Sequence, residues 1–483
     1  MISKLYIRTD GSSSIGLGHL VRCIALSKML DDSFNIHFAC KQIPDSIAVE
    51  IRDAGFALLI LQNDNELLSV LTPEDMVVVD SYELESDYQQ AIKKIGCQLI
   101  CIDDLHEKPS YADLILNHTP CVSPQEYNAQ PYTQFALGPS YALIRPAFLE
   151  LAVKERVQVD SASVLICFGG SDSRNLTKVA LSVVSTFSQF KNIAIVTGTA
   201  YSHQQSLDEI LEQQDNVVHY HNISAEEMAQ RMSEADLCIV PASGILTEAL
   251  TSGAKIISGM YVDNQIFVFE NYKRANAFIS AENFSEENLF LAVKNYFSQE
   301  HVKGARLVDG QSGERINKLF QQLVKERDFH LRRVTIEDAE LTYQWASDKK
   351  VRQYSLSQST IQFDDHLAWL SRKWTDPKCI FYIALFCGKP VGSIRFDLND
   401  GDAVISYLLD PDYHGQGLGA VMLKKGILSL GEASEDKIER LSGIVMPDNI
   451  SSCRTFERFG FEREHDGENY KYTMNIHDEN RNI

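Results

Sequence analysis

The chain has 483 residues, with 45 Lys and Arg against 66 Asp and Glu, so its formal net charge is −21. At roughly 150 residues per domain, this length predicts about three domains. So acidic a chain repels phosphate backbones and anionic lipid surfaces, which argues against general nucleic-acid or membrane-surface binding. The sequence has no apolar run near the roughly 18 residues of a membrane span and no secretory signal at its start. We therefore expect a cytoplasmic protein.

The ten cysteines lie mostly within apolar, strand-like runs such as 165–168 and 237–240. Cys97 and Cys101 are the closest pair, but they share one such run and have no second pair of metal ligands nearby. Small buried hydrophobic side chains are therefore the better interpretation, and we expect reduced thiols and no metal site.

From residue 5 to about 325, short β-branched runs alternate with amphipathic stretches, for example at 19–30 and 88–95. This βαβ pattern predicts parallel sheets with both faces covered. The pattern stops over 118–160, a segment with five prolines, and then resumes. We expect an α/β fold of two Rossmann-like halves, 1–150 and 151–326, with a ligand between them beyond the carboxyl ends of the strands. The expected strands are 5–8, 35–39, 57–61, 76–80 and 98–103 in the first half, and 163–168, 193–196, 217–220, 237–240 and 256–259 in the second.

A third unit, 327–483, does not continue this pattern. Residues 305–326 predict a closing helix, and a mixed helical region with Trp345 and Trp369 follows. Strands are expected at 380–386 and 391–398. The unit is predicted to be a separate α+β domain.

A glycine-rich turn joins the first expected strand to its helix. It reads Arg8-Thr-Asp-Gly-Ser-Ser-Ser-Ile-Gly-Leu-Gly-His19. Glycines let backbone N–H groups approach an anion, and a helix N-terminus favours negative charge, although a purely steric turn would look similar. The same helix terminus disfavours imidazolium, so His19 is expected to be a neutral base suited to activating water. A histidine that only hydrogen-bonds a loop is the alternative.

The second half supplies matching elements. Gly169, Gly170 and Ser171 follow its first expected strand. In the run 241–250, Ser243 is expected to cap a helix, and Glu248 to accept both hydroxyls of a ribose. The run Asp-Asn-Gln at 263–265 opens another helix toward the same cleft.

Two Rossmann-like halves with this Ser-Gly…Glu segment resemble the GT-B fold of UDP-sugar enzymes. The combination of Arg-Thr-Asp-Gly-Ser, Gly-x-Gly-His, Arg-Cys at 22–23, Phe-Gly-Gly-Ser-Asp and Asp-Asn-Gln resembles, more narrowly, the UDP-sugar hydrolases of pseudaminic acid biosynthesis over about residues 1–325. This resemblance implies release of UDP from UDP-2,4-diacetamido-2,4,6-trideoxy-β-L-altropyranose, with His19 activating water. The UDP- or substrate-binding residues it implies are Asp10, Gly16, Gly18, Gly169, Gly170, Ser171, Ser243, Ile245, Glu248 and Asn264.

A second glycine turn lies in the third unit, within the run 404–420. A strand, then Gly415-x-Gly417-x-Gly419, then a helix start makes a backbone cradle for a pyrophosphate, although a helix-entry turn is the alternative. With the downstream run 449–461, this pattern resembles the GCN5-related N-acetyltransferases (GNAT) over roughly residues 329–476. The resemblance implies an acetyl-CoA site made of Leu408, Leu409, Gln416, Gly417, Gly419, Ala420 and Asn449.

Two positions depart from the GNAT pattern. His414 replaces the usual Gln or Arg, and Phe456 stands where many members have the tyrosine that protonates the leaving thiolate. Either Tyr407 or another group substitutes for that tyrosine, or the thiolate leaves unassisted. The resemblance also makes His366 and Trp369 candidate substrate or acid/base residues, with core packing as the alternative for Trp369.

Together the two resemblances imply a bifunctional enzyme of consecutive steps. The third unit would N-acetylate the 4-amino group of a UDP-amino-sugar with acetyl-CoA as cosubstrate, and the first two would then hydrolyse the product, without a metal. The expected partners are UDP-activated amino-sugars, and a homo-oligomer stays open. The rival functions are a GT-B glycosyltransferase fused to an acetyltransferase of another substrate, and a non-catalytic nucleotide-sugar sensor.

Overall fold

The computed structural model describes residues 3–12, 15–155, 162–212, 214–298, 307–433 and 438–476. The chain forms two compact units, Met1–Phe320 and Gln321–Ile483. The division falls within one helix, α12 (Ser312–Asp328). The boundaries expected at 150 and 326 stay predictions. Within the described residues, no helix has both the length and the apolar character of a membrane span.

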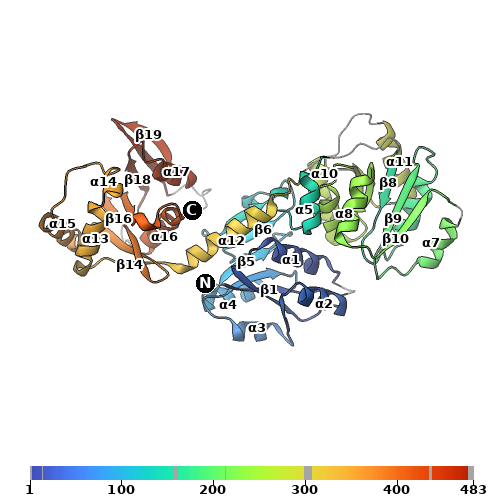
Figure 1. Ribbon diagram of the computed structural model, residues 1–483, viewed down its shortest axis with the longest axis horizontal. Helices are drawn as coiled ribbons and strands as arrows, with labels where there is room; N and C mark the ends of the chain where they lie inside the picture. The colour runs from blue at the N-terminus through green and yellow to red at the C-terminus, as the bar shows by residue number, and fades with distance from the viewer. Residues whose placement is uncertain are drawn as a thin grey trace. The chain divides into compact units, whose positions relative to one another are not determined.

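The first sheet is wholly parallel, in the order β3-β2-β1-β4-β5-β6-β7. Figure 1 labels its strands β1, β5 and β6. Strand β1 lies between β2 and β4, so the winding reverses there, and ligands bind beyond the carboxyl ends of strands at such a reversal. The strands are β1 (Ser3–Thr9), β2 (Phe34–Cys40), β3 (Ala57–Ile60), β4 (Met76–Asp80), β5 (Gln98–Ile102), β6 (Leu114–Asn117) and β7 (Gln134–Leu137). The helices are α1 (Gly18–Met29), α2 (Asp45–Asp53), α3 (Asp64–Val70), α4 (Ser86–Ile95) and α5 (Pro146–Val153).

The five strands expected in this half are all present, but three details differ. Strand β6, only four residues long, was not expected. Strand β3 is largely exposed rather than covered on both faces, because it is the edge strand of the sheet. Strand β7 lies in the proline-rich segment where no strand was expected; its four residues are too few to show a periodicity.

The second sheet is also parallel, in the order β10-β9-β8-β11-β12-β13. Its helices cover both faces, because Leu165 and Cys167 enter one hydrophobic cluster while Val164 and Ile166 enter another. The strands are β8 (Ser163–Ile166), β9 (Asn192–Thr197), β10 (Val217–His221), β11 (Leu237–Pro241), β12 (Lys255–Gly259) and β13 (Ile279–Ser280). The helices are α6 (Leu176–Val184), α7 (Gln204–Leu211), α8 (Ala225–Glu234), α9 (Gly244–Ala249), α10 (Ile266–Arg274) and α11 (Glu286–Ser298).

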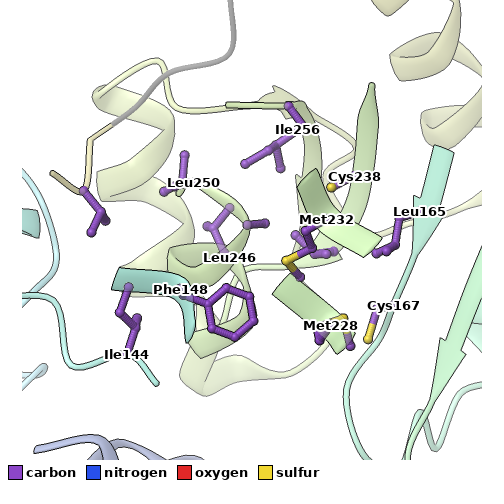
Figure 2. Packing of buried hydrophobic residues seen from close by; sticks show 14 of the residues in the cluster. Ile144, Phe148, Leu165, Cys167, Met228, Met232, Cys238, Leu246, Leu250 and Ile256 are labelled. Atoms are coloured by element: carbon purple, nitrogen blue, oxygen red, sulfur yellow. The ribbon is translucent and has the colours of Figure 1, made fainter. Parts of the chain in front are cut away.

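The core of this second half includes residues that precede its first strand. Figure 2 shows Phe148 of α5 among Met228 and Met232 of α8 and Leu246 of α9. Phe148 is fully buried in this core, so α5 packs as part of the second half. The helix begins at Pro146, before the boundary expected at residue 150. The two Rossmann-like halves predicted from the sequence are therefore present.

The C-terminal unit contains a mixed sheet in the order β14-β15-β16-β17-β18-β20-β19. Strands β17 and β18 are parallel and pair only through Asp402–Val404, so the carboxyl end of β17 separates from β18 in the described part of the unit. The strands are β14 (Phe329–Arg333), β15 (Cys379–Phe386), β16 (Lys389–Asn399), β17 (Asp402–Leu409), β18 (Arg440–Val445), β19 (Glu462–Asp466) and β20 (Asn469–Asn475). The helices are α13 (Ala339–Ser347), α14 (Lys349–Arg352), α15 (Phe363–Thr375), α16 (Leu418–Ala433) and α17 (Ile450–Arg458), and the expected α+β character is confirmed.

Candidate functional site

His19 lies in the first turn of α1, directly beyond the carboxyl edge of β1. Asp80 is the last residue of the neighbouring strand β4, in register with Thr9 of β1. The two side chains meet, with His19 Nδ1 2.6 Å from Asp80 Oδ1, and the Asp80 side chain is fully buried. An ionised Asp80 accepts a proton donated by Nδ1, which leaves the lone pair on Nε2 free to act as a base. This geometry suits proton abstraction from water.

Arg22, one turn further along α1, keeps that carboxylate ionised. Its guanidinium donates to both oxygens of Asp80, at 2.7 and 2.6 Å, and also to Asp104, which follows β5. Burial alone would raise the pKa of Asp80, but the charge of Arg22 and the contact with His19 outweigh burial and hold this pKa well below its ordinary value. Tyr82 adds a hydrogen bond from its hydroxyl to Asp104 at 3.0 Å, and its ring meets the His19 ring edge-on.

In the turn before His19, Gly16 and Gly18 leave the backbone open, and Asp10 at its start holds two strand ends together. Gly16 has a φ of +88°, a conformation that disfavours any side chain, and a Cβ at Gly18 would meet no atom within 4 Å. Asp10, an expected ligand residue, accepts instead from the backbone N–H groups of Lys41 and Gln42 and pairs with fully buried Arg8. The structure therefore shows Asp10 anchoring the β1 and β2 ends, and a contact with substrate stays a prediction.

The turn after β8 is exposed at Gly170 and Ser171, and Gly169 has a φ of +81°. Asp172, the next residue, is buried and accepts from the backbone N–H groups of Leu176 and Thr177 at the start of α6. This aspartate of the Phe-Gly-Gly-Ser-Asp motif is therefore a helix cap, while the three residues before it remain available to a ligand.

At two residues of the run 243–248, Ser243 and Glu248, the contacts in the structure differ from those predicted from the sequence. Ser243 is the N-cap residue of α9, but its side chain makes no capping hydrogen bond, so that expectation was wrong; the N–H of Leu246 donates to the Ser243 carbonyl instead. Both oxygens of Glu248 accept from the guanidinium of Arg145 at 2.8 Å. Ile245 is half-buried, and Asn264 is exposed in the short 3-10 helix Asp263–Gln265 before α10.

Among the described residues, two contacts link loops of the first sheet to α10 of the second half, whereas the Arg145–Glu248 pair joins the start of α5 to α9. The rings of His106 and Phe267 lie 4.9 Å apart. The Tyr272 hydroxyl donates to the backbone carbonyl of His118 at 3.5 Å. The loops beyond the first sheet thus face the helix α10 of the second half.

The glycine turn of the C-terminal unit connects β17 to α16. Gly415 and Gly417 have φ values of +76° and +79°, and a Cβ on Gly415 would meet no atom within 4 Å. The side chain of Gln416 donates to the Asp412 carbonyl, and the backbone carbonyl of Gln416 accepts from Lys325 Nζ at 2.9 Å. Open backbone N–H groups beside a lysine ammonium fit a diphosphate.

Comparisons with known proteins agree with both parts of the chain. A family model described as acetyltransferase (GNAT) domain matches residues 328–462. The chain is 30% identical over 267 residues to the UDP-2,4-diacetamido-2,4,6-trideoxy-β-L-altropyranose hydrolase of Campylobacter jejuni, an alignment that covers 54% of this chain and 93% of that protein. The chain belongs to the family of this hydrolase. Its C-terminal part is a GNAT domain, fused to the hydrolase-like part.

Other similar proteins align with larger or smaller shares of this chain. An uncharacterized protein of Methanocaldococcus jannaschii is 23% identical over 98% of this chain and 99% of its own length. The spore coat polysaccharide biosynthesis protein SpsG of Bacillus subtilis is 23% identical over 66% of this chain and 98% of its own. A solved structure of RimL, a ribosomal L7/L12 alpha-N-protein acetyltransferase in complex with coenzyme A, is 17% identical over 31% of this chain and 94% of its own, with a TM-score of 0.28.

In the GNAT domain, Tyr407 is the candidate acid. Its hydroxyl donates to Ser452 Oγ at 3.0 Å, and burial raises the pKa of Tyr407, so it stays protonated. Phe456 lies in the hydrophobic core, stacked on Tyr472. Asn449 is the N-cap of α17 and accepts from the Ser452 N–H at 3.2 Å. Leu408 and Leu409 lie on the part of β17 that has separated from β18; Gly419 and Ala420 begin α16.

His366 and Trp369 both lie on α15. His366 is buried, with Nε2 2.9 Å from Thr342 Oγ1, and burial lowers its pKa. Trp369 is half-buried, packs against Phe381 and lies under the guanidinium of Arg395. These contacts favour packing for both residues, and a role in substrate binding stays a prediction.

Sequence reasoning missed four partners of the predicted residues: Asp80, Asp104, Arg145 and Lys325. Arg22 belongs to the Arg-Cys part of the motif, but the sequence assigned it no role. Asp80 could have been found, because an acidic residue directly ends the apolar run 76–80. Nothing local indicates Arg145, whose partner Glu248 lies 103 residues away. In the described residues, no group of three or more His, Cys, Asp or Glu side chains is placed to hold a metal ion.

Proposed function

We propose that the chain is a bifunctional sugar-nucleotide enzyme. Its hydrolase part releases UDP from UDP-2,4-diacetamido-2,4,6-trideoxy-β-L-altropyranose, and its GNAT domain N-acetylates the 4-amino group of the precursor with acetyl-CoA. The observation that carries the proposal is the His19–Asp80 pair beyond the carboxyl edge of β1 and β4, at the reversal of the sheet. The hydrolase of Campylobacter jejuni, which is 30% identical over 93% of its length, supports the choice of substrate.

In the hydrolytic step, Nε2 of His19 takes a proton from a water molecule as the water oxygen bonds to C1 of the sugar. The bond from C1 to the UDP oxygen breaks, and UDP leaves with that electron pair as an anion. UDP is a good leaving group, so the main tasks of the protein are to place the water and the diphosphate. Asp80 orients the imidazole and stabilises the imidazolium that forms.

UDP would be bound mainly by the second half. We assign its diphosphate to the exposed turn Gly169, Gly170 and Ser171, and its ribose to Glu248, with Ser243, Ile245 and Asn264 nearby. The Arg145 pair holds the Glu248 carboxylate in one orientation, and each of its oxygens retains a further lone pair that can accept from a ribose hydroxyl.

The acetyl transfer uses the other unit. The fit of acetyl-CoA rests on the open glycine turn, where N–H groups at 416–420 would hold the diphosphate, and on the separated end of β17 for the pantetheine arm. The substrate amine bonds to the acetyl carbonyl carbon and loses a proton, and the thiolate leaves. Tyr407, kept protonated by burial, would return a proton to that thiolate.

The test supplies the purified chain with UDP-4-amino-4,6-dideoxy-β-L-AltNAc, with and without acetyl-CoA. We expect free thiol and UDP to be released only when acetyl-CoA is present. Absence of both products would contradict the proposal. UDP release only on addition of an acceptor sugar would instead indicate a glycosyltransferase.

A further inference from the structure

His118 lies at the same sheet edge as the His19–Asp80 pair, and the hydrolytic step described above does not use it. It directly follows β6, which ends at Asn117. Strands β1, β4, β5 and β6 are consecutive neighbours in the sheet. Asp80, Asp104 and His118 therefore lie at or just beyond the ends of three adjacent strands. His19 lies in α1, the helix that follows the fourth strand, β1.

The register places His118 beside Asp104. Ile102 of β5 pairs with Leu116 of β6, so two residues further on, the two parallel chains bring Asp104 and His118 to equivalent positions. The same charges that surround His19, those of Asp104, Arg22 and Asp80, act on the His118 ring. His118 is thus a second histidine of the same cluster.

The His118 side chain has an unmet hydrogen-bonding capacity. Its Nδ1 is buried and has no hydrogen-bond partner within the described ranges of the chain. A buried polar atom without a partner is costly, and in native structures it commonly marks a place that another group fills. The backbone of His118 is held at the junction of the halves, since its carbonyl accepts from Tyr272, whose hydroxyl also lies 3.2 Å from Thr247 Oγ1, next to Glu248.

We propose that His118 is a substrate-binding residue of the hydrolase site and hydrogen-bonds a neutral polar group of the sugar, such as an acetamido group. This inference rests on the proposed hydrolase function. The cluster holds two carboxylates, Asp80 and Asp104, against one guanidinium, Arg22, so it disfavours the diphosphate and favours the uncharged sugar. Burial lowers the pKa of His118, so the imidazole is neutral and offers one donor and one acceptor.

The test measures binding without turnover, in a chain carrying His19→Asn. Calorimetry gives the Kd for UDP-2,4-diacetamido-2,4,6-trideoxy-β-L-altropyranose and for UDP, before and after His118→Asn or His118→Phe. We expect the Kd for the UDP-sugar to rise about tenfold and the Kd for UDP to stay the same, because only the sugar meets His118. The matched control is His37→Phe, since His37 also has a buried ring nitrogen without a partner in the described structure but lies mid-strand in β2.

Two results would overturn the inference. One is an unchanged Kd for the UDP-sugar in both His118 variants. The other is an equal loss of affinity for UDP, which indicates a structural role at the junction. If the His19→Asn chain binds neither UDP nor the UDP-sugar, the proposed hydrolase function itself fails, and that result is seen before His118 is changed.

Discussion

Asp80 Oδ1 lies 2.6 Å from His19 Nδ1, and the buried Asp80 carboxylate is shared between this imidazole and the guanidinium of Arg22. Asp80 thus orients the imidazole of His19 and neutralises the charge of Arg22. Because the pair joins the end of β4 to the start of α1, the chemistry of the site and the stability of the first half depend on the same carboxylate.

Asp80 should make stability depend on pH in the acidic range. Its folded-state pKa lies well below the unfolded value of about 4, so its stabilisation is complete above that pH and is lost as pH falls below it. We expect Asp80→Asn to lower the free energy of unfolding by about 3 kcal/mol at pH 7, since it leaves Arg22 short of one buried partner. Thermal melting of both proteins from pH 7 to pH 3 checks this: the difference should shrink toward pH 3, and a constant difference would refute it.

The Arg145–Glu248 pair should govern UDP affinity. Glu248→Ala removes the proposed ribose acceptor, and we expect the Kd for UDP to rise about tenfold, as for a lost charge-assisted hydrogen bond. Arg145→Met keeps the Glu248 carboxylate but removes the ion pair that fixes its orientation, so we expect a smaller rise in the Kd for UDP. Calorimetry with UDP measures both. Arg231→Met, which breaks the Arg231–Glu234 pair on α8, is the control and should leave the Kd unchanged. An unchanged Kd in Glu248→Ala would exclude the ribose assignment.

The glycine turn of the GNAT domain should tolerate no side chain at Gly417. Its φ of +79° strains any other residue by about 1 kcal/mol or more, so the turn would shift and its N–H groups would lose their positions. We expect Gly417→Ala to raise the KM for acetyl-CoA about tenfold in a free-thiol assay. The matched control is Gly388→Ala, which has a φ of +75° in the turn between β15 and β16 and should leave KM unchanged. Equal KM changes in both variants would contradict a diphosphate role for the turn.

Lys325 offers a separate test of the same turn. Its ammonium donates to the Gln416 carbonyl at 2.9 Å, so its charge lies at the proposed diphosphate position. We expect Lys325→Met to weaken binding of acetyl-CoA several-fold, and the effect to decline at high salt because the interaction is electrostatic. Acetyl-pantetheine, which has no diphosphate, should be used equally well by both proteins; a matching loss with it would contradict this role.

The fold was predictable where the sequence pattern is local. Buried parallel strands are continuous apolar runs, such as Met76–Asp80, and a run of that kind is visible without any partner. The four-residue strand β7 shows no such pattern, and the pairing of Gln134–Leu137 with β6 is decided by neighbouring strands. In the first sheet, local sequence therefore predicted β1 to β5 but not β6 and β7, which complete the sheet.

The candidate site was predictable only in part, for a related reason. His19 and the glycine turns lie at strand-to-helix junctions, which a sequence shows directly. Asp80 and Arg145 become part of the site through contacts across 61 and 103 residues. The capping bond expected at Ser243 did not form; the Leu246 N–H donates to the Ser243 carbonyl instead of to its hydroxyl.

The most direct test of the account is UDP release from UDP-2,4-diacetamido-2,4,6-trideoxy-β-L-altropyranose by the full chain and by its His19→Asn variant. We predict that the variant loses UDP release by a factor of at least about 100, as expected for loss of a general base. Thiol release from acetyl-CoA with the amino-sugar substrate should continue, because it takes place in the other unit. UDP release at the unchanged rate in the variant would contradict the account.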